Sequence, residues 1–172
     1  MGFPLPLESG IIKSRSAVME ARRLEKEAEM TIAAILRTRS DDHVVTVAPD
    51  MPVKEVLTLL ADKRIGAVPV MDGDRLVGIM SERDMIYGIR RDGSAFLDQP
   101  VRHAMTTSVI TVGSDVTPFD ALAMMTRRRI RHLPVVDDGV VIGFVSIGDL
   151  VKARIEAIEA EAAAMRDYIQ TA

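Results

Sequence analysis

The alternation of apolar and polar positions runs through this chain twice, in the same order. When the sequence is shifted by 65 residues, residues 44–90 align with residues 109–155 without a gap. The aligned stretches include the runs VVTV and VITV, the motifs VPVMD and LPVVD, and the motifs GIMSERD and GFVSIGD. A shared register of this length indicates two copies of one structural unit.

The first half of each unit is predicted to be a strand followed by a helix. The runs VVTV and VITV are rich in β-branched residues, which favour strands. Asp50 and Asp115 follow, with proline close by, and are predicted to be helix N-caps. The next apolar positions have the helical i, i+3, i+4, i+7 spacing that predicts one buried face. They are Val53, Val56, Leu57 and Leu60 in the first copy, and Phe119, Leu122 and Met125 in the second.

The second half of each unit is predicted to be a β-hairpin followed by a helix. Two apolar runs flank a short turn, DGD in the first copy and DDG in the second. The last helix begins near Ser81 or Ser146. We therefore expect an α/β fold of the α+β-like kind, with two β-α-β-β-α repeats. Because one unit of this size closes a core poorly, the two are expected to pack about a pseudo-twofold axis.

The repeat divides the chain into five segments. We expect an N-terminal extension over residues 1–30 that is partly disordered or helical, and a polar linker over residues 91–105. The repeats occupy residues 31–90 and 106–155, and residues 156–172 extend the last helix. An apolar stripe on that helix is expected to pack on its own domain or across a dimer, with partner binding as the alternative. The stripe comprises Val151, Ile155, Ile158 and Ala162.

Composition narrows the possible functions. The 172 residues include no cysteine, which excludes disulfides, thiolate metal sites and a cysteine nucleophile, and suits the cytoplasm. A net charge of −3 and 3% aromatic residues argue against nucleic-acid binding, and no apolar run is long enough for a membrane span. No phosphate loop of the GxxxxGK[ST] type occurs. His43, His103 and His132 lack the spacing of a metal site or catalytic triad.

The motif that ends each hairpin has two interpretations. The pattern S-x-x-D before an apolar run is typical of a capping box, in which serine and aspartate satisfy free amides of the helix. Its recurrence after a strand and a glycine, where backbone can approach a ligand closely, favours binding instead. Phosphate is stabilised at a helix N-terminus, where Ser81 and Ser146 lie. Asp84 and Asp149 are suited to the two hydroxyls of a ribose, and capping and binding can coexist.

With h-P-V-x-D followed by G-h-h-S-x-x-D in each copy, the chain resembles the CBS domain family, whose paired domains are called a Bateman module. The resemblance covers about residues 31–158 and looks like a stand-alone bacterial CBS pair. It implies binding of an adenine nucleotide (AMP, ADP or ATP), or of NAD or S-adenosylmethionine, in clefts between the repeats. It also implies a homodimer and an unidentified regulated protein.

The same resemblance implies roles for three further residues. Thr46 and Thr111, at the ends of the first strands, are expected beside the nucleotide, and Val68 is expected against adenine. The competing interpretation is strand propensity for the threonines and core packing for the valine.

The two copies differ most where Gly66-Ala67 aligns with Arg131-His132. The resemblance implies that this position reaches into the cleft of the other repeat. We call the cleft with Ser81 and Asp84 the first cleft, and the cleft with Ser146 and Asp149 the second cleft. Arg131 is expected in the first cleft, where Arg83 adds a second cation, and Gly66 is expected in the second. The second cleft is therefore predicted to be less charged and roomier.

The resemblance implies a regulatory binding module, and the residue patterns give no sign of enzymatic activity or a catalytic cofactor. The alternatives are a structural scaffold that binds no ligand, an S-adenosylmethionine sensor, and a nucleotide hydrolase. The hydrolase is disfavoured because no nucleophile–base pair is visible.

Overall fold

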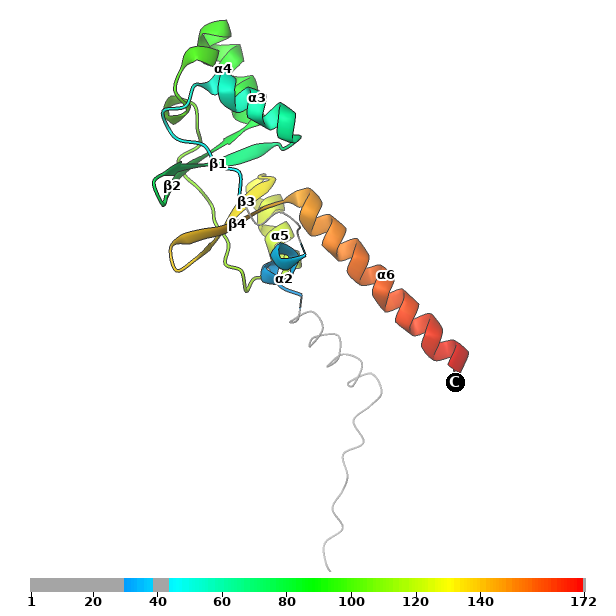
Figure 1. Cartoon of the computed structure of the whole chain (residues 1–172). Helices are drawn as coiled ribbons and strands as arrows, with labels where there is room; N and C mark the ends of the chain where they lie inside the picture. Colours follow the sequence, from blue (N-terminus) through cyan, green and yellow to red (C-terminus); the bar gives the residue numbers. More distant parts are fainter. Residues whose placement is uncertain (1–29, 39–43, 172) are drawn as a thin grey trace, which may run out of the picture.

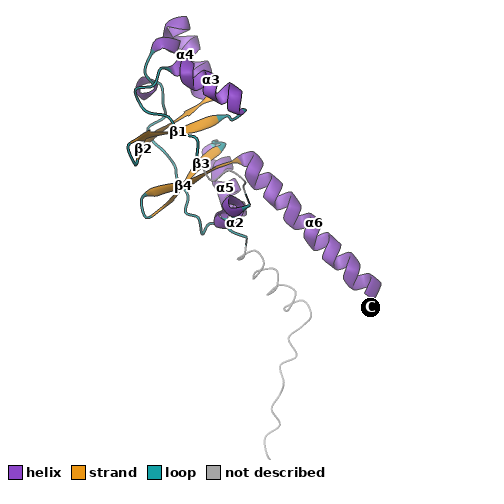
Figure 2. Ribbon diagram, viewed as in Figure 1, coloured by secondary structure: helices purple, strands orange, loops and turns teal. Residues whose placement is uncertain are grey.

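Two β-hairpins form the centre of the molecule, with helices on both outer sides (Figure 1; Figure 2). The computed structural model describes residues 30–38 and 44–171, so nearly all of the predicted N-terminal extension, and His43, lie outside the described residues. The hairpins are β1 (Ala67–Asp72) with β2 (Arg75–Ser81), and β3 (His132–Asp137) with β4 (Val140–Ser146). Both have the same register and the same bulge. The predicted fold class and the repeat are confirmed.

The predicted first strand of each repeat is much shorter than expected. Val47 makes a single parallel bridge to Val70, and Val112 makes one to Val135. The amide of Val47 donates to the carbonyl of Pro69 at 3.1 Å, and the amide of Val112 donates to that of Pro134 at 3.0 Å. The next bond of each ladder would need an N–H from the same proline, which has none. Proline therefore ends both ladders after one step.

Four helices have the predicted positions but not all of the predicted buried faces. They are α3 (Val53–Lys63), α4 (Glu82–Asp92), α5 (Pro118–Arg128) and α6 (Ile147–Thr171). A further short helix, α2 (Ile32–Arg37), was not predicted. Leu57 is 40% exposed and Phe119 is 70% exposed, so the prediction that they are buried is wrong. Phe119 occupies the repeat position of Lys54, whereas Ala121 occupies that of the buried Val56. The repeat register identifies the buried face better than the local apolar spacing does.

The predicted N-caps Asp50 and Asp115 are also wrong. Helix α3 has Pro52 at its N-cap, and α5 has Thr117, whose hydroxyl accepts from the Asp120 amide at 3.1 Å. Helix α5 begins at Pro118, which favours an extended conformation in the residue before it. The helix therefore starts too late for Asp115 to cap it. Asp50 forms an ion pair with Arg102 instead.

The segment before each copy of the aligned pattern, residues 44–90 and 109–155, packs against the other copy. Helix α2 lies before residue 44, yet its Ile32 and Ile35 are buried in the second core. The connection between the repeats forms two 3-10 helices, Gly93–Asp98 and Val101–His103, and buries Phe96 and Val101 in the first core. This exchange of leading segments ties the two repeats together.

The segments that lie before the two aligned copies explain why the G-h-h-S-x-x-D motif begins with glycine. A Cβ at Gly78 would overlap the side chain of Met105, and a Cβ at Gly143 would overlap that of Leu36. Met105 and Leu36 both belong to segments that lead into a repeat. The glycines admit neighbouring protein side chains, so the expectation that they make room for a ligand is not needed to explain them.

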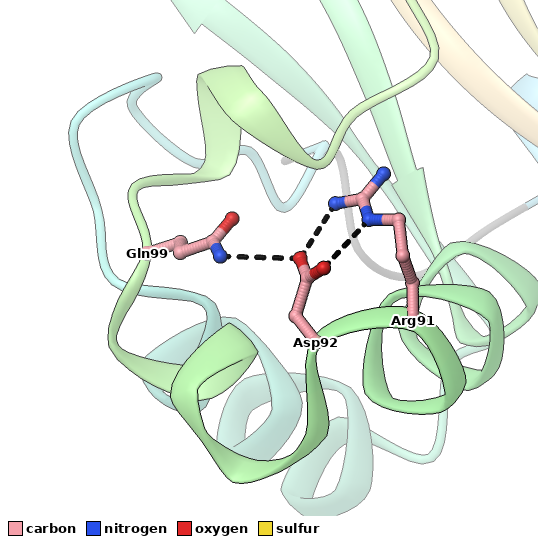
Figure 3. Close-up of polar contacts among 3 residues, drawn as sticks. All are labelled: Arg91, Asp92 and Gln99. Atoms are coloured by element: carbon pink, nitrogen blue, oxygen red, sulfur yellow. Dashed lines mark hydrogen bonds and ion pairs between the residues drawn. The ribbon is translucent and has the colours of Figure 1, made fainter.

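The start of the connection is held by polar contacts at the end of α4 (Figure 3). Arg91 donates to the Asp92 carboxylate through Nε at 2.9 Å and through Nη2 at 2.8 Å. The Gln99 side-chain amide donates to the same carboxylate at 3.2 Å. Asp92 therefore links α4 to the far end of the first 3-10 helix.

Replacing Gly88 by alanine is expected to destabilise the folded chain by about 1–3 kcal/mol, because the added Cβ would overlap the ring of Phe96. Urea unfolding measures the change in the free energy of unfolding. Gly148→Ala is the matched control, since a Cβ there meets only the Ser146 hydroxyl at 3.5 Å. A Gly88→Ala protein as stable as the control would contradict this packing.

Candidate nucleotide-binding clefts

The two S-x-x-D motifs form the same capping box. Ser81 is the N-cap of α4, and its amide and hydroxyl donate to Asp84 Oδ2 at 2.9 and 2.5 Å. The Asp84 amide donates back to Ser81 Oγ at 3.4 Å. At the start of α6 the equivalent three distances between Ser146 and Asp149 are 2.7, 2.7 and 3.2 Å. The capping geometry orients each aspartate at a helix N-terminus, where an anion is also stabilised.

The first cleft lies between the two repeats and has a volume of about 180 Å³. Repeat 1 contributes Ser81, Arg83 and Asp84 to its lining, and repeat 2 contributes Arg131. The sequence-predicted set therefore comes together here. Apolar side chains also line this cleft: Ile79, Val109, Ile110 and Ile130.

A threonine that sequence reasoning missed also reaches the first cleft. Thr106 Oγ1 donates to Asp84 Oδ1 at 3.1 Å. Because Asp84 Oδ2 is held by the capping box, Oδ1 is the oxygen that faces the connection to the second repeat. The backbone of Thr106 pairs with Ile79 of β2, which places the hydroxyl at this point. In the sequence, Thr106 is marked only by its position just before the second aligned copy, which begins at residue 109.

Arg83 connects the first cleft to the second repeat. Its Nη1 donates to the carbonyl of Arg129 at 3.0 Å. Arg129 ends α5 in the left-handed conformation and lies two residues before Arg131. One arm of the Arg83 guanidinium is thus used structurally, while Arg131 is exposed on the opposite repeat.

The second cleft is larger, with a volume of about 850 Å³, and is more cationic than expected. Ser146 and Asp149 line it together with Gly66, as predicted. Arg64 and Lys152 line it too, so each cleft has two cationic and two carboxylate side chains. The prediction of a roomier cleft agrees with the volumes, but the prediction of a less charged one is wrong. Arg64 was missed although it aligns with Arg129 in the repeat.

His132 lies at the junction of the two clefts and lines both, together with Gly66. Its ring stacks on Phe144, with centroids 5.6 Å apart and an interplanar angle of 4°. Burial lowers the pKa of His132, and Arg131 lowers it further, while Asp149 and Glu82 oppose the shift. The imidazole is therefore favoured in its neutral form and stands between carboxylates from both clefts.

The lowered pKa of His132 predicts a loss of stability in acid. The unfolded chain binds a proton near the ordinary pKa of 6.5, whereas the folded chain binds it only at lower pH. The free energy of unfolding should therefore fall as pH drops below about 6.5, and a His132→Gln protein should lose less over the same range. Urea unfolding between about pH 5 and 8 measures both proteins. Parallel pH profiles would contradict the assignment.

Three sequence-predicted site residues lie away from these clefts. Val68 is fully buried in the first core, which agrees with the packing interpretation. Thr46 is exposed and lines neither cleft. Thr111 is exposed and lines a shallow depression near the hairpin turns, together with Asp72 and Asp74. Val44 and Val45, the residues just before Thr46, line the second cleft instead.

Neither a metal-binding cluster nor a membrane-spanning helix is found in residues 30–38 and 44–171. Within these ranges no group of three or more His, Cys, Asp or Glu side chains is arranged to hold a metal ion. Across the same residues, no helix has both the length and the apolar character that a membrane span requires.

Comparison with known proteins agrees with the fold. The family model for the CBS domain matches residues 32–91 and 101–156. The CBS-domain protein ATU1752 from Agrobacterium tumefaciens is 38% identical, with a TM-score of 0.69 over 73% of this chain and 99% of that one. The CBS domain pair of protein MJ0100, solved with 5′-methylthioadenosine and S-adenosylmethionine, is 24% identical over 72% of this chain and 94% of that one, with a TM-score of 0.63.

An enzyme also contains a related segment. Inosine-5′-monophosphate dehydrogenase from Korarchaeum cryptofilum is 34% identical over 142 residues, which cover 82% of this chain but 28% of the enzyme. The chain thus spans about a quarter of that relative. With two matched copies and the same fold as solved CBS pairs, this chain belongs to the CBS domain family.

Proposed function

We propose that this chain is a regulatory module that binds an adenine nucleotide between its two repeats. The observation that carries the proposal is the convergence of Ser81 and Asp84 from repeat 1 with Arg131 from repeat 2 on one cleft. An arginine and a helix N-terminus both favour phosphate, and a carboxylate suits the ribose hydroxyls. The adenosyl ligands bound by the MJ0100 pair support this class of ligand.

The two clefts are proposed to accept ligand differently. A volume of about 850 Å³ lies within the usual range for a small-molecule site, so the second cleft has room for a whole nucleotide. The first cleft, at about 180 Å³, has room for only part of one. Binding there requires the cleft to widen, and a ribose at Asp84 Oδ1 would replace the hydrogen bond from Thr106.

Widening of the first cleft would disturb two hydrogen bonds that join the repeats. Thr106 bonds to Asp84 and Arg83 bonds to the Arg129 carbonyl, and both bonds join the repeats. A phosphate that attracts the Arg83 guanidinium competes with the second contact. Ligand binding is therefore proposed to change how the repeats are held together, and a regulated protein would detect that change. We further propose that the module acts as a homodimer.

A thermal-shift panel tests the proposal, with AMP, ADP, ATP, NAD and S-adenosylmethionine as ligands. A ligand that binds only the folded state stabilises it by about 2.7 kcal/mol at 100 times its Kd. That corresponds to a rise in Tm of about 5 °C or more for a chain of this size. No shift with any of the five at millimolar concentration would favour the scaffold alternative. Product formed on incubation with ATP would indicate an enzyme instead.

A further inference from the structure

The C-terminal part of α6 extends away from the rest of the described chain (Figure 1). Leu150 is fully buried, but from residue 159 to residue 170 every side chain is exposed. Such a helix would gain little stability by itself in water, because isolated helices depend on packing of an apolar face. The sequence nevertheless carries such a face along its length.

The apolar face follows a heptad repeat without interruption. Successive members are separated by four, three, four, three and four residues, which is the spacing of coiled-coil a and d positions. The five large side chains on it are between 43% and 70% exposed. The a positions are Ile155, Ala162 and Ile169, and the d positions are Val151, Ile158 and Met165.

We propose that this face binds the same face of a second copy, so that two α6 helices form a parallel, in-register coiled coil. The charges beside the apolar face identify the occupant. In this arrangement Arg154 lies beside Glu159 of the partner subunit, and Glu161 lies beside Arg166 of the partner subunit. By symmetry each pair occurs twice, which gives four attractive pairs. This inference rests on the proposed function, because it names the surface through which the proposed homodimer would form.

The same charges oppose the antiparallel arrangement that keeps the whole face in contact. There Glu159 would face Glu159 of the partner subunit, and Glu161 would face Glu161 of the partner subunit. Lys152 would also face Arg166 of the partner subunit. Like charges that face each other across a coiled coil repel, which disfavours the antiparallel arrangement. In the parallel arrangement the charged pairs named above are attractive.

A single cysteine tests the register, because the chain has none of its own. In the parallel coil the two copies of position 169 face each other, so an Ile169→Cys protein should form a disulfide-linked dimer on mild oxidation. In the antiparallel pairing position 169 would lie about 27 Å from its counterpart, beside position 151. A non-reducing gel of the full chain reports the fraction crosslinked.

Two variants in the Ile169→Cys background test the apolar face. Ile158→Glu places a charge in the seam and should slow crosslinking by about tenfold or more. Ala160→Glu places the same charge on the outer side of the helix and should leave the rate unchanged. Failure of Ile169→Cys to crosslink, or equal rates for the two glutamate variants, would overturn the proposal.

A charge reversal with rescue tests the choice of partner. Glu161→Arg should slow crosslinking, since it faces Arg166 of the partner subunit, and Glu161→Arg with Arg166→Glu should restore it. If the double variant stays as slow as the single one, the paired charges do not set the register and the proposal fails. Ile158→Glu should keep the nucleotide thermal shift of the unmodified chain. A lost crosslink with a retained shift therefore separates the dimer surface from the nucleotide site.

Discussion

Replacing Phe96 by alanine is expected to destabilise the folded chain by about 3–5 kcal/mol, the range for a fully buried phenylalanine. The ring is 1% exposed and lies among the apolar side chains of the first core. It also rests on Gly88, so the cavity would open directly beneath α4. Loss of the ring should loosen the connection from the repeat on which it packs.

The same substitution at Phe119 is the matched control. Phe119 is 70% exposed, so Phe119→Ala is expected to change the free energy of unfolding by less than about 0.5 kcal/mol. Urea unfolding of both proteins under identical conditions gives the comparison. Equal destabilisation by the two substitutions would show that residues 91–105 are a loose linker, as their polar composition suggests.

Arg131→Ala is expected to weaken AMP binding by about 10- to 100-fold and to leave adenosine binding nearly unchanged. A hydrogen bond between charged groups contributes about 1.5–3 kcal/mol, and adenosine has no phosphate to receive it. Arg131 is exposed and lines the first cleft together with Ser81, so removal of its side chain should not affect folding. Calorimetric titration with AMP and with adenosine measures the two affinities.

Arg127→Ala provides the control for Arg131. Arg127 is exposed in the last turn of α5 and lines neither cleft, so the substitution removes the same charge at a different place. A general effect of net charge would lower AMP affinity in both proteins. An unchanged AMP affinity in Arg131→Ala would remove Arg131 from the site, and an equal loss in Arg127→Ala would attribute the effect to long-range charge.

Much of the architecture followed from patterns within short stretches of sequence. The 65-residue register predicted two hairpins, and they have the same pairing and the same bulge. The S-x-x-D motifs predicted the two capping boxes, since each links residues only three positions apart. Local rules failed where proline intervened. Pro69 and Pro134 shortened the first strands, and Pro118 moved the start of α5 beyond Asp115.

The residues assigned to the clefts also divide into those that a local motif predicts and those that it does not. Ser81, Asp84, Ser146 and Asp149 were identified from their motif, and the mismatch between Gly66 and Arg131 distinguished the two copies. Val68 was a weaker assignment, because a valine in a buried strand has the same sequence pattern whether it faces a ligand or a core.

By itself, the sequence determined the two repeats, their hairpins and their capping boxes, because these depend on contacts between residues near one another in the chain. Only the tertiary structure decided how the repeats are joined. Thr106 reaches Asp84 across 22 positions, and Arg83 reaches the Arg129 carbonyl across 46. The leading segments pack on the opposite repeats, and His132 is placed between the clefts. No local pattern specifies such contacts, since they form only when the packed cores bring distant segments together.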